Sequence, residues 1–287
     1  MKISILIPDL AGGGAEFVAA EWAAWLSALG EEVAVLTTKD SARPQESVAY
    51  EVRRIGGGST LSRLKALRRY MTAERPDVIL AFMPYFNLLA LIARIGLGGK
   101  FPKVVISGRN VEAPFRRLFG SSFIAKQAVA KIMYPKADAY LAISHPVASE
   151  ALAVYRISPE NMFVVPNPAT AKSDRSQARV KLNLSQESRK EYVPEEINII
   201  VPARLVEQKR PEIAILVAAR IAQDGHNVIV HYFGAGPLED SVRALAQVED
   251  VNIVIHGWVG EWFLDLPLNS IVLLPSLAEG FGNVLLE

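Results

Sequence analysis

The chain has 287 residues, 51% of them hydrophobic and 21% charged, which is typical of a globular protein and excludes a disordered one. Its 31 basic and 30 acidic side chains give a net charge of +1, which excludes a uniformly basic protein that coats nucleic acid. The absence of cysteine excludes a disulfide scaffold, a cysteine-based zinc site and a thiol nucleophile.

Short apolar runs alternate with segments of helical periodicity along the first half of the chain. Strands are predicted at 3–7, 33–37, 78–82, 104–107, 140–143 and 163–165, and helices at 15–29 and 61–71. A glycine-rich turn, Gly12–Gly14, separates the first strand from the first helix. This alternation is typical of a parallel sheet covered on both faces.

A polar stretch with few apolar residues begins near Pro166, and we interpret residues 169–196 as a surface excursion after a domain crossing. A second alternation follows, with strands predicted at 197–201, 228–233, 252–256 and 271–274 and helices at 213–223 and 239–247. The predicted fold class is therefore α/β, with two Rossmann-like, doubly wound parallel-sheet domains. Their predicted bounds are 1–166 and 167–287, and roughly 100–200 residues is the usual size of a domain.

Neither an export signal nor a membrane span is evident. The first apolar run stops at Pro8 and Asp9, which is too short for a signal peptide. The apolar stretch 79–97 is interrupted by Pro84, Asn87 and Arg94, whereas a span needs about 20 apolar residues. We expect a cytoplasmic protein that can attach to the inner face of the cell membrane.

The small net charge hides a strongly basic segment. Residues 53–136, called the basic block below, contain 16 basic and 3 acidic side chains, whereas residues 1–52 and 137–287 are both acidic. Aromatic residues such as Phe115, Phe119 and Phe123 lie between the cations, a pattern that suits an anionic membrane surface. A solvated basic surface and a site for an anionic substrate are the alternatives. We expect no nucleic-acid partner, because no known binding module is present.

Several motifs share one chemistry, the recognition of a diphosphate. Gly13 and Gly14 precede a predicted helix, whose N-terminal N–H groups favour an anion. The dinucleotide pattern G-x-G-x-x-G is broken, because Phe17 stands where the third glycine belongs. Arg204 and Lys209 follow a predicted strand, so both can point to the carboxyl edge of a sheet, where ligands bind in open α/β folds. For these residues a tight turn or a solvated surface is the alternative interpretation.

Two more motifs lie further along the chain. Gly234 and Gly236 form a turn between a strand and a helix. Near the end, Glu279 is followed by glycines and then by Glu287, and we expect a helix to begin after Gly282. The alternatives are a plain turn for the glycines and compensation of a helix dipole for the carboxylates.

The sequences R-L-x-x-x-K at 204–209, G-A-G-P at 234–237 and P-S-x-x-E-G-F-G-x-x-x-x-E at 275–287 resemble the large retaining glycosyltransferase family 4. The resemblance extends over essentially the whole chain. It implies the GT-B fold, with a nucleotide-sugar donor in the cleft between the domains and the acceptor mainly on the N-terminal domain. It also implies no cofactor and no metal ion, since the sequence has no Asp-x-Asp motif.

The resemblance implies a role for each matching residue. Arg204 and Lys209 would stabilise charge on the leaving diphosphate, and Glu279 would orient the donor sugar. Glu287 would bind the ribose hydroxyls. The other implied donor contacts are Gly13, Gly14, Gly234, Gly236, Phe281, Gly282 and Asn283.

The sequence departs from the family pattern in two places. Many members have a histidine at the end of an N-terminal-domain strand, where this chain reads S-G-R-N, so Arg109 and Asn110 are the candidates for the acceptor or sugar contact. The chain also stops at Glu287 inside an apolar helical pattern, from which we expect an incomplete second domain.

The predicted function is transfer of a hexose or N-acetylhexosamine from a nucleotide-sugar, with a UDP-sugar as first choice, to a glycan or polyprenyl-diphosphate-linked acceptor in cell-envelope polysaccharide synthesis. The alternative is a truncated fragment that binds nucleotide-sugar without turnover. A sugar-nucleotide epimerase is disfavoured by the pattern of Glu279 and Glu287, and a nicotinamide oxidoreductase by the broken glycine fingerprint.

Overall fold

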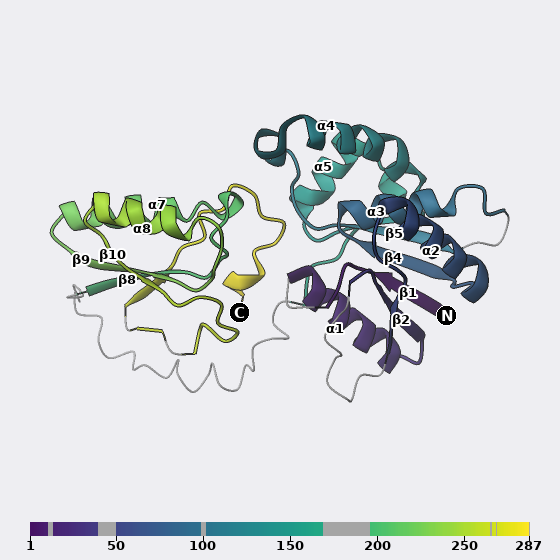
Figure 1. The fold of residues 1–287 in the computed structure, drawn as a ribbon, viewed down its shortest axis with the longest axis horizontal. Helices are drawn as coiled ribbons and strands as arrows, with labels where there is room; N and C mark the ends of the chain where they lie inside the picture. The colour runs from purple at the N-terminus through teal and green to yellow at the C-terminus, as the bar shows by residue number, and fades with distance from the viewer. Residues whose placement is uncertain are drawn as a thin grey trace. The chain divides into compact units, whose positions relative to one another are not determined.

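The structure is a computed structural model that describes residues 1–10, 14–39, 50–98, 102–168, 196–264, 266–267 and 269–286, without the side chains of 116–119 and 122. The chain divides into two compact units, Met1–Pro168 and Ala169–Glu287 (Figure 1). Each unit contains a parallel sheet, so the predicted α/β class is confirmed. Within the described residues, no helix is long and apolar enough to cross a membrane.

The sheet of the N-terminal unit has the strand order β3-β2-β1-β4-β5-β6-β7 among the described residues, and all neighbours are parallel. Its strands are β1 Lys2–Leu6, β2 Glu32–Thr37, β3 Glu51–Arg54, β4 Val78–Phe82, β5 Lys103–Gly108, β6 Ala139–Ala142 and β7 Met162–Val164. The order reverses between β1 and β4, and the carboxyl ends of strands at such a switch point are where open α/β sheets bind ligands.

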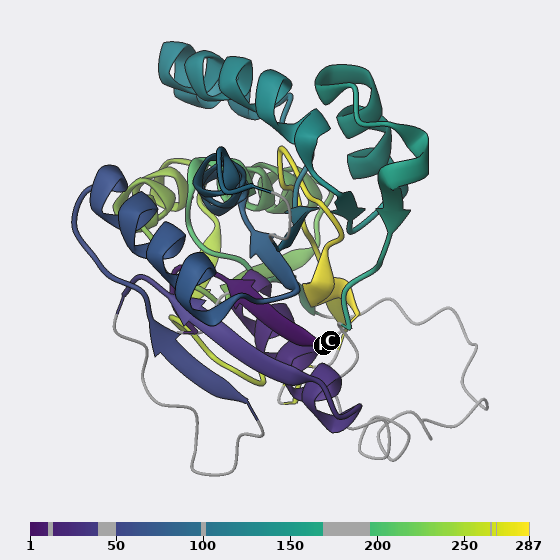
Figure 2. The ribbon, with the colours of Figure 1, turned by 90° about the vertical axis from the view of Figure 1, so that its right-hand side faces the viewer.

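Helices lie on both faces of this sheet (Figure 2). The contacts of neighbouring side chains along β1 agree with this arrangement. Ile5 packs with Val18 of α1, while the neighbouring Ser4 Oγ lies 2.9 Å from the Tyr70 hydroxyl of α2. Because adjacent side chains of a strand point to opposite faces, α1 and α2 lie on opposite sides of the sheet. The helices are α1 Gly14–Ala28, α2 Thr60–Glu74, α3 Pro84–Arg94, α4 Phe115–Met133 and α5 His145–Tyr155.

Among the described strands and α-helices of this unit, four were not predicted from the sequence: β3, α3, α4 and α5. The sequence of β3, E-V-R-R, has no apolar run, because in the described part of the chain this edge strand pairs with β2 alone and packs only Val52 against the core. In α4, Gly120 has non-helical angles of φ 56° and ψ −136°, which interrupts the helical periodicity.

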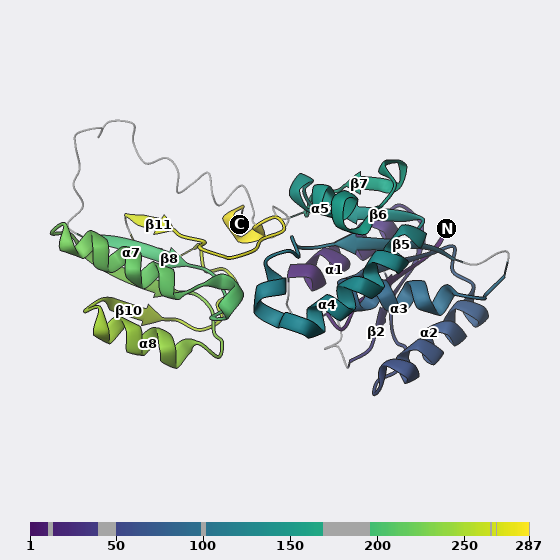
Figure 3. The same cartoon turned by 90° about the horizontal axis from the view of Figure 1, so that it is seen from above.

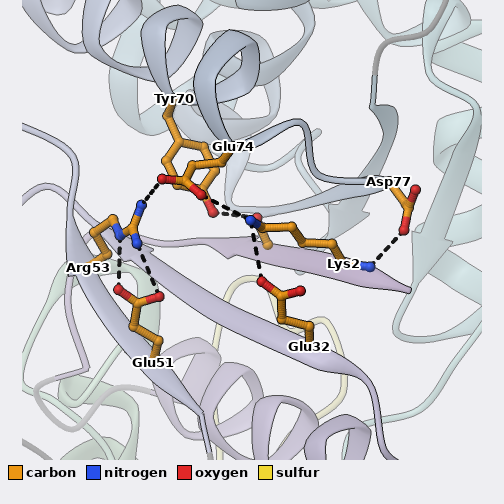
Figure 4. Close-up of polar contacts among 8 residues, drawn as sticks. Lys2, Glu32, Glu51, Arg53, Tyr70, Glu74 and Asp77 are labelled. Atoms are coloured by element: carbon orange, nitrogen blue, oxygen red, sulfur yellow. Dashed lines mark hydrogen bonds and ion pairs between the residues drawn. The ribbon is translucent and has the colours of Figure 1, made fainter.

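An ion-pair network lies at the amino edge of the same sheet (Figure 4). Its residues line a cavity of about 290 Å³. Lys2 Nζ lies 2.9 Å from Glu74, and Arg53 contacts Glu74 at 2.6 Å and Glu51 at 2.9 Å. These two cations hold the pKa of Glu74 below its ordinary value. Since Arg53 belongs to the basic block, part of that block's charge is neutralised within the protein.

The C-terminal unit has the strand order β10-β9-β8-β11, all parallel, among its described residues (Figure 3). Its elements are β8 Glu196–Val201, α7 Glu212–Gln223, β9 Asn227–Tyr232, α8 Glu239–Val248, β10 Asn252–Ile255 and β11 Ser270–Val272. Helices α7 and α8 pack on one face, where Val201, Val230 and Tyr232 form a core with Ala214 and Ala218.

On β9, His231 points to the opposite face from Val230 and Tyr232 and belongs to a chain of polar contacts. His231 Nε2 lies 2.8 Å from Asn198 Oδ1, and its Nδ1 lies 3.1 Å from His256 Nε2. The His256 ring stacks on Phe233, with centroids 4.3 Å apart. Burial and the neighbouring His256 lower the pKa of His231 below its ordinary value, while Glu196 opposes this shift.

These contacts predict a pH-dependent stability. Because folded His231 binds a proton less readily than unfolded His231, the free energy of unfolding should fall as pH drops below about 6.5. His231→Gln should therefore lose less stability than the wild type between pH 7 and pH 5 in chemical denaturation. His226→Gln, which changes an exposed histidine of the same unit, should keep the wild-type loss. Equal losses in all three proteins would contradict the expectation.

Candidate active site

Three loops meet at the carboxyl edge of the second sheet, because they follow neighbouring parallel strands. The loop after β8 carries Arg204 and Lys209, the loop after β9 carries Gly234 and Gly236, and the loop after β11 carries Glu279. Strand β8 pairs with both β9 and β11, so its loop lies between the other two.

Two of the predicted catalytic residues are in direct contact. Lys209 Nζ forms an ion pair with Glu279 Oε1, although the two residues are 70 positions apart. Both side chains are largely buried, with relative exposures of 18% and 28%. The backbone of the two loops is also joined, since the Leu277 N–H donates to the Gln208 carbonyl at 2.8 Å. The structure thus brings these two charges together as one site.

Arg204 has a different environment. Its side chain is exposed and forms no ion pair or hydrogen bond with any described residue. It lies on the same loop as Lys209, but no hydrogen bond or ion pair between described residues joins its side chain to the Lys209–Glu279 pair. No described residue therefore occupies the N–H donors of this guanidinium.

Gly234 and Gly236 lie directly against the loop that carries Arg204. A Cβ at Gly234 would be 2.2 Å from the Ala203 carbonyl oxygen, and one at Gly236 would be 2.3 Å from that of Leu205. The Leu205 N–H donates to the Ala235 carbonyl at 3.1 Å. The absence of a side chain therefore lets the loops after β8 and β9 touch, which is a structural reason for glycine at both positions.

The segment after Glu279 differs from the sequence prediction. Phe281 is half-buried, Gly282 has a left-handed φ of 70°, and Asn283–Leu285 form a single turn of 3-10 helix, not the expected α-helix. Glycine is favoured at Gly282, since other residues rarely adopt a positive φ. Glu287 lies outside the described residues.

At the carboxyl edge of the first sheet, Arg109 follows β5. Its guanidinium lies over the Phe82 ring, 5.0 Å from the centroid, and its Nη1 is 3.5 Å from Ser107 Oγ. Burial lowers the pKa of Arg109 to about 10, and Glu16 on α1 opposes this shift. Arg109 forms no ion pair with a described residue, so it is a cation available to an anionic or hydroxylated ligand.

The other N-terminal candidates are less informative. Asn110 is half-buried beside Arg109, and Gly14 is the exposed first residue of α1. Gly13 lies outside the described residues. In the described part of the chain, no group of three or more histidine, aspartate or glutamate side chains is placed to hold a metal ion.

Sequence reasoning missed two features of these edges. Met83, directly after β4, has φ 74° and ψ 148°, a conformation that costs a residue other than glycine about 1–3 kcal/mol and is often found at functional sites. Ser276 has a buried hydroxyl without a hydrogen-bond partner among the described residues. The strain at Met83 has no signal in the sequence. Ser276 lies inside the motif that contains Glu279, which could have drawn attention to it.

Comparison with known families identifies the chain. The family model for the glycosyl transferase 4-like domain matches residues 13–168, which is more than half of the chain. The chain belongs to this glycosyltransferase family. A second model, for glycosyl transferases group 1, matches residues 185–287 and includes Arg204, Lys209 and Glu279.

Solved structures similar to this glycosyltransferase support the GT-B type of fold. Sucrose-phosphate synthase from Thermosynechococcus elongatus aligns with a TM-score of 0.73 and 18% identity, over 98% of this chain and 77% of that one. WaaG, a glycosyltransferase involved in lipopolysaccharide biosynthesis, aligns with a TM-score of 0.70 and 14% identity, over 99% of this chain and 77% of WaaG. The lipopolysaccharide outer core galactosyltransferase WaaB aligns with a TM-score of 0.65 and 18% identity, over 100% of this chain and 77% of WaaB. A search of curated proteins gave no match.

Proposed function

We propose that this glycosyltransferase moves a hexose or N-acetylhexosamine from a nucleotide-sugar to a lipid-linked or other glycan acceptor in cell-envelope polysaccharide synthesis, with retention of configuration. The observation that carries the proposal is the Lys209–Glu279 contact, which joins two distant motifs into one charged site. The involvement of WaaG in lipopolysaccharide biosynthesis supports the class of product. A UDP-sugar is the first donor to test.

The chemistry assigned to the site is electrostatic. The bond between the anomeric carbon and the leaving phosphate oxygen breaks with its electron pair on the diphosphate. An acceptor hydroxyl oxygen bonds to the same carbon, and its proton passes to the leaving phosphate. Lys209 and Arg204 stabilise the charge that develops on the diphosphate, and Glu279 accepts hydrogen bonds from the donor sugar.

The remaining residues bind the substrates. Glu287 binds the ribose, the backbone of 281–283 lies beside the donor sugar, and Gly13, Gly14, Gly234 and Gly236 allow close approach to the donor. We assign the N-terminal unit to the acceptor and the C-terminal unit to the donor. Arg109 and Asn110 contact the acceptor or the transferred sugar, and the half-buried Arg109 cation is the feature that supports this assignment.

The experiment is product analysis with UDP- and GDP-sugars, with and without a polyprenyl-diphosphate-linked saccharide. Release of nucleoside diphosphate together with a longer saccharide supports the proposal. A changed sugar nucleotide in the absence of acceptor would identify an epimerase instead. If a folded sample neither binds UDP or GDP nor forms product, the proposed donor site is wrong.

We also propose that the basic block contacts an anionic membrane surface, with α4 as the main element. Along the sequence of α4, the exposed Val129 lies between the exposed cations Lys126 and Lys131. Two further exposed apolar residues flank this pair, Ile124 before Lys126 and Ile132 after Lys131. Each cation near an anionic surface contributes about 1 kcal/mol, and exposed apolar side chains add to this. By contrast, Arg94 of the same block pairs with Asp138 and is not available.

Reversing two of these charges tests the membrane contact. The double variant Lys126→Glu/Lys131→Glu should bind vesicles of phosphatidylglycerol and phosphatidylcholine at least tenfold more weakly in co-sedimentation. Arg220→Glu/Arg243→Glu, which makes the same charge change on α7 and α8, should bind like the wild type. Equal weakening in both variants would show a net-charge effect and contradict a contact through α4.

A further inference from the structure

Gln208 lies between Arg204 and Lys209 and makes two contacts with the loop that carries Glu279. Its backbone carbonyl accepts the Leu277 N–H at 2.8 Å, and its side-chain Nε2 donates to the Ala278 carbonyl at 3.0 Å. Gln208 therefore holds the two residues that immediately precede Glu279. The next residue of its own loop, Lys209, is the partner of Glu279.

The side-chain bond is sheltered from water. Ala278 is only 5% exposed and Gln208 is half-buried. Loss of the Gln208 side-chain N–H group would leave the buried Ala278 carbonyl without a hydrogen-bond partner, which is the costly way to break a hydrogen bond. The bond should therefore persist while the loops around it move.

Apart from the Lys209 ion pair and the contacts of Gln208, no helix or strand among the described residues fixes the position of Glu279. Strand β11 ends at Val272, and the next regular element is the 3-10 turn Asn283–Leu285, so Glu279 belongs to an irregular segment. Such a segment depends on specific contacts for its geometry. A misplacement of about 1 Å can cost on the order of 100-fold in turnover.

We propose that Gln208 is a positioning residue, a latch that sets the distance between Lys209 and Glu279 and thereby controls donor affinity and turnover. The inference rests on the proposed function of that pair. Gln208 acts through Glu279 and does not itself touch the donor. In this proposal the spacing of the two charges decides whether a diphosphate and a sugar can be bound together. Gln208 therefore affects binding of the nucleotide-sugar as well as its turnover.

The first test measures the latch without any substrate. Gln208→Met keeps the length of the side chain and removes the Nε2 group that donates the hydrogen bond to Ala278. Amide hydrogen exchange of peptides covering 277–283 should be about tenfold faster in this variant. Gln247→Met, the same substitution at an exposed site on α8, should leave it unchanged. Exchange of 277–283 at the wild-type rate in Gln208→Met would overturn the latch.

The second test asks whether Gln208 acts through Glu279. Gln208→Met should lower kcat for the transferred sugar at least tenfold and raise the KM for the nucleotide-sugar, measured at a temperature where thermal unfolding shows Gln208→Met and Gln247→Met to be fully folded. In a Glu279→Gln background the same change should have little further effect, because residues that act as a unit are not additive. Independent, multiplying effects would overturn the proposal.

The two tests separate this inference from the proposed function. A wild type that binds no nucleotide and turns over no nucleotide-sugar contradicts the proposed function. In that case hydrogen exchange alone decides whether Gln208 holds the Glu279 loop.

Discussion

Lys209→Ala is expected to lower turnover by about 10²–10³-fold, the usual cost of removing one group that stabilises developing charge. The ammonium of Lys209 lies in a largely buried position, where its attraction for a diphosphate is weakened little by water. Steady-state kinetics with the best donor of the panel measures the effect. Calorimetric titration with UDP or GDP should show weaker binding as well, since the lost cation would attract the diphosphate both in the bound complex and in the transition state.

Glu279→Gln should separate binding from turnover. In the ligand-free protein Glu279 neutralises Lys209, so an incoming diphosphate must compete with this carboxylate. Removing the negative charge should leave nucleoside diphosphate binding equal or tighter. Turnover should fall, because a neutral amide accepts hydrogen bonds from the donor sugar through one oxygen and more weakly than a carboxylate does. If Glu279→Gln weakens UDP or GDP binding as strongly as Lys209→Ala, then Glu279 does not compete for Lys209.

Gly234→Ala is expected to destabilise the C-terminal unit by about 1–3 kcal/mol, the usual cost of inserting a methyl group into a close-packed contact. The new Cβ would lie 2.2 Å from the Ala203 carbonyl oxygen, which is backbone and cannot rotate away. The displaced backbone leads directly to Arg204. A loss of donor affinity should therefore accompany the loss of stability.

Gly260→Ala is the matched control. It makes the same change in the same unit, and its Cβ would be 3.6 Å from the Trp258 side chain, an ordinary contact. Thermal unfolding and nucleotide binding of Gly260→Ala should resemble those of the wild type. A Gly234→Ala variant as stable as Gly260→Ala would mean that the loops after β8 and β9 can separate without cost.

Much of the fold was predictable because its central strands are buried on both faces. Runs such as 78–82 and 197–201 are almost continuously apolar, and the structure has strands there within one residue. Edge strand β3 and the kinked α4 were not predictable, because backbone pairing and a tolerated kink leave no periodic signal. The helix expected after Gly282 is a single 3-10 turn among the described residues.

The candidate residues were found through their motifs, but their relations were not. R-L-x-x-x-K and P-S-x-x-E are separate signals in a sequence, and nothing in either indicates which pairs of atoms meet. The same holds for Gln208, which no motif marks, and for Met83, whose strained backbone exists only in the folded chain.

The sequence by itself determined the α/β class, the alternation of elements and the residue types that can bind a diphosphate, because hydrophobic periodicity and local turn chemistry are properties of neighbouring residues. Only the tertiary structure decided that Lys209 meets Glu279, that Gln208 binds the loop that carries Glu279, and that Gly234 and Gly236 allow a backbone contact. The physical reason is that parallel pairing of β8 with β9 and β11 brings together loops that are distant in the chain.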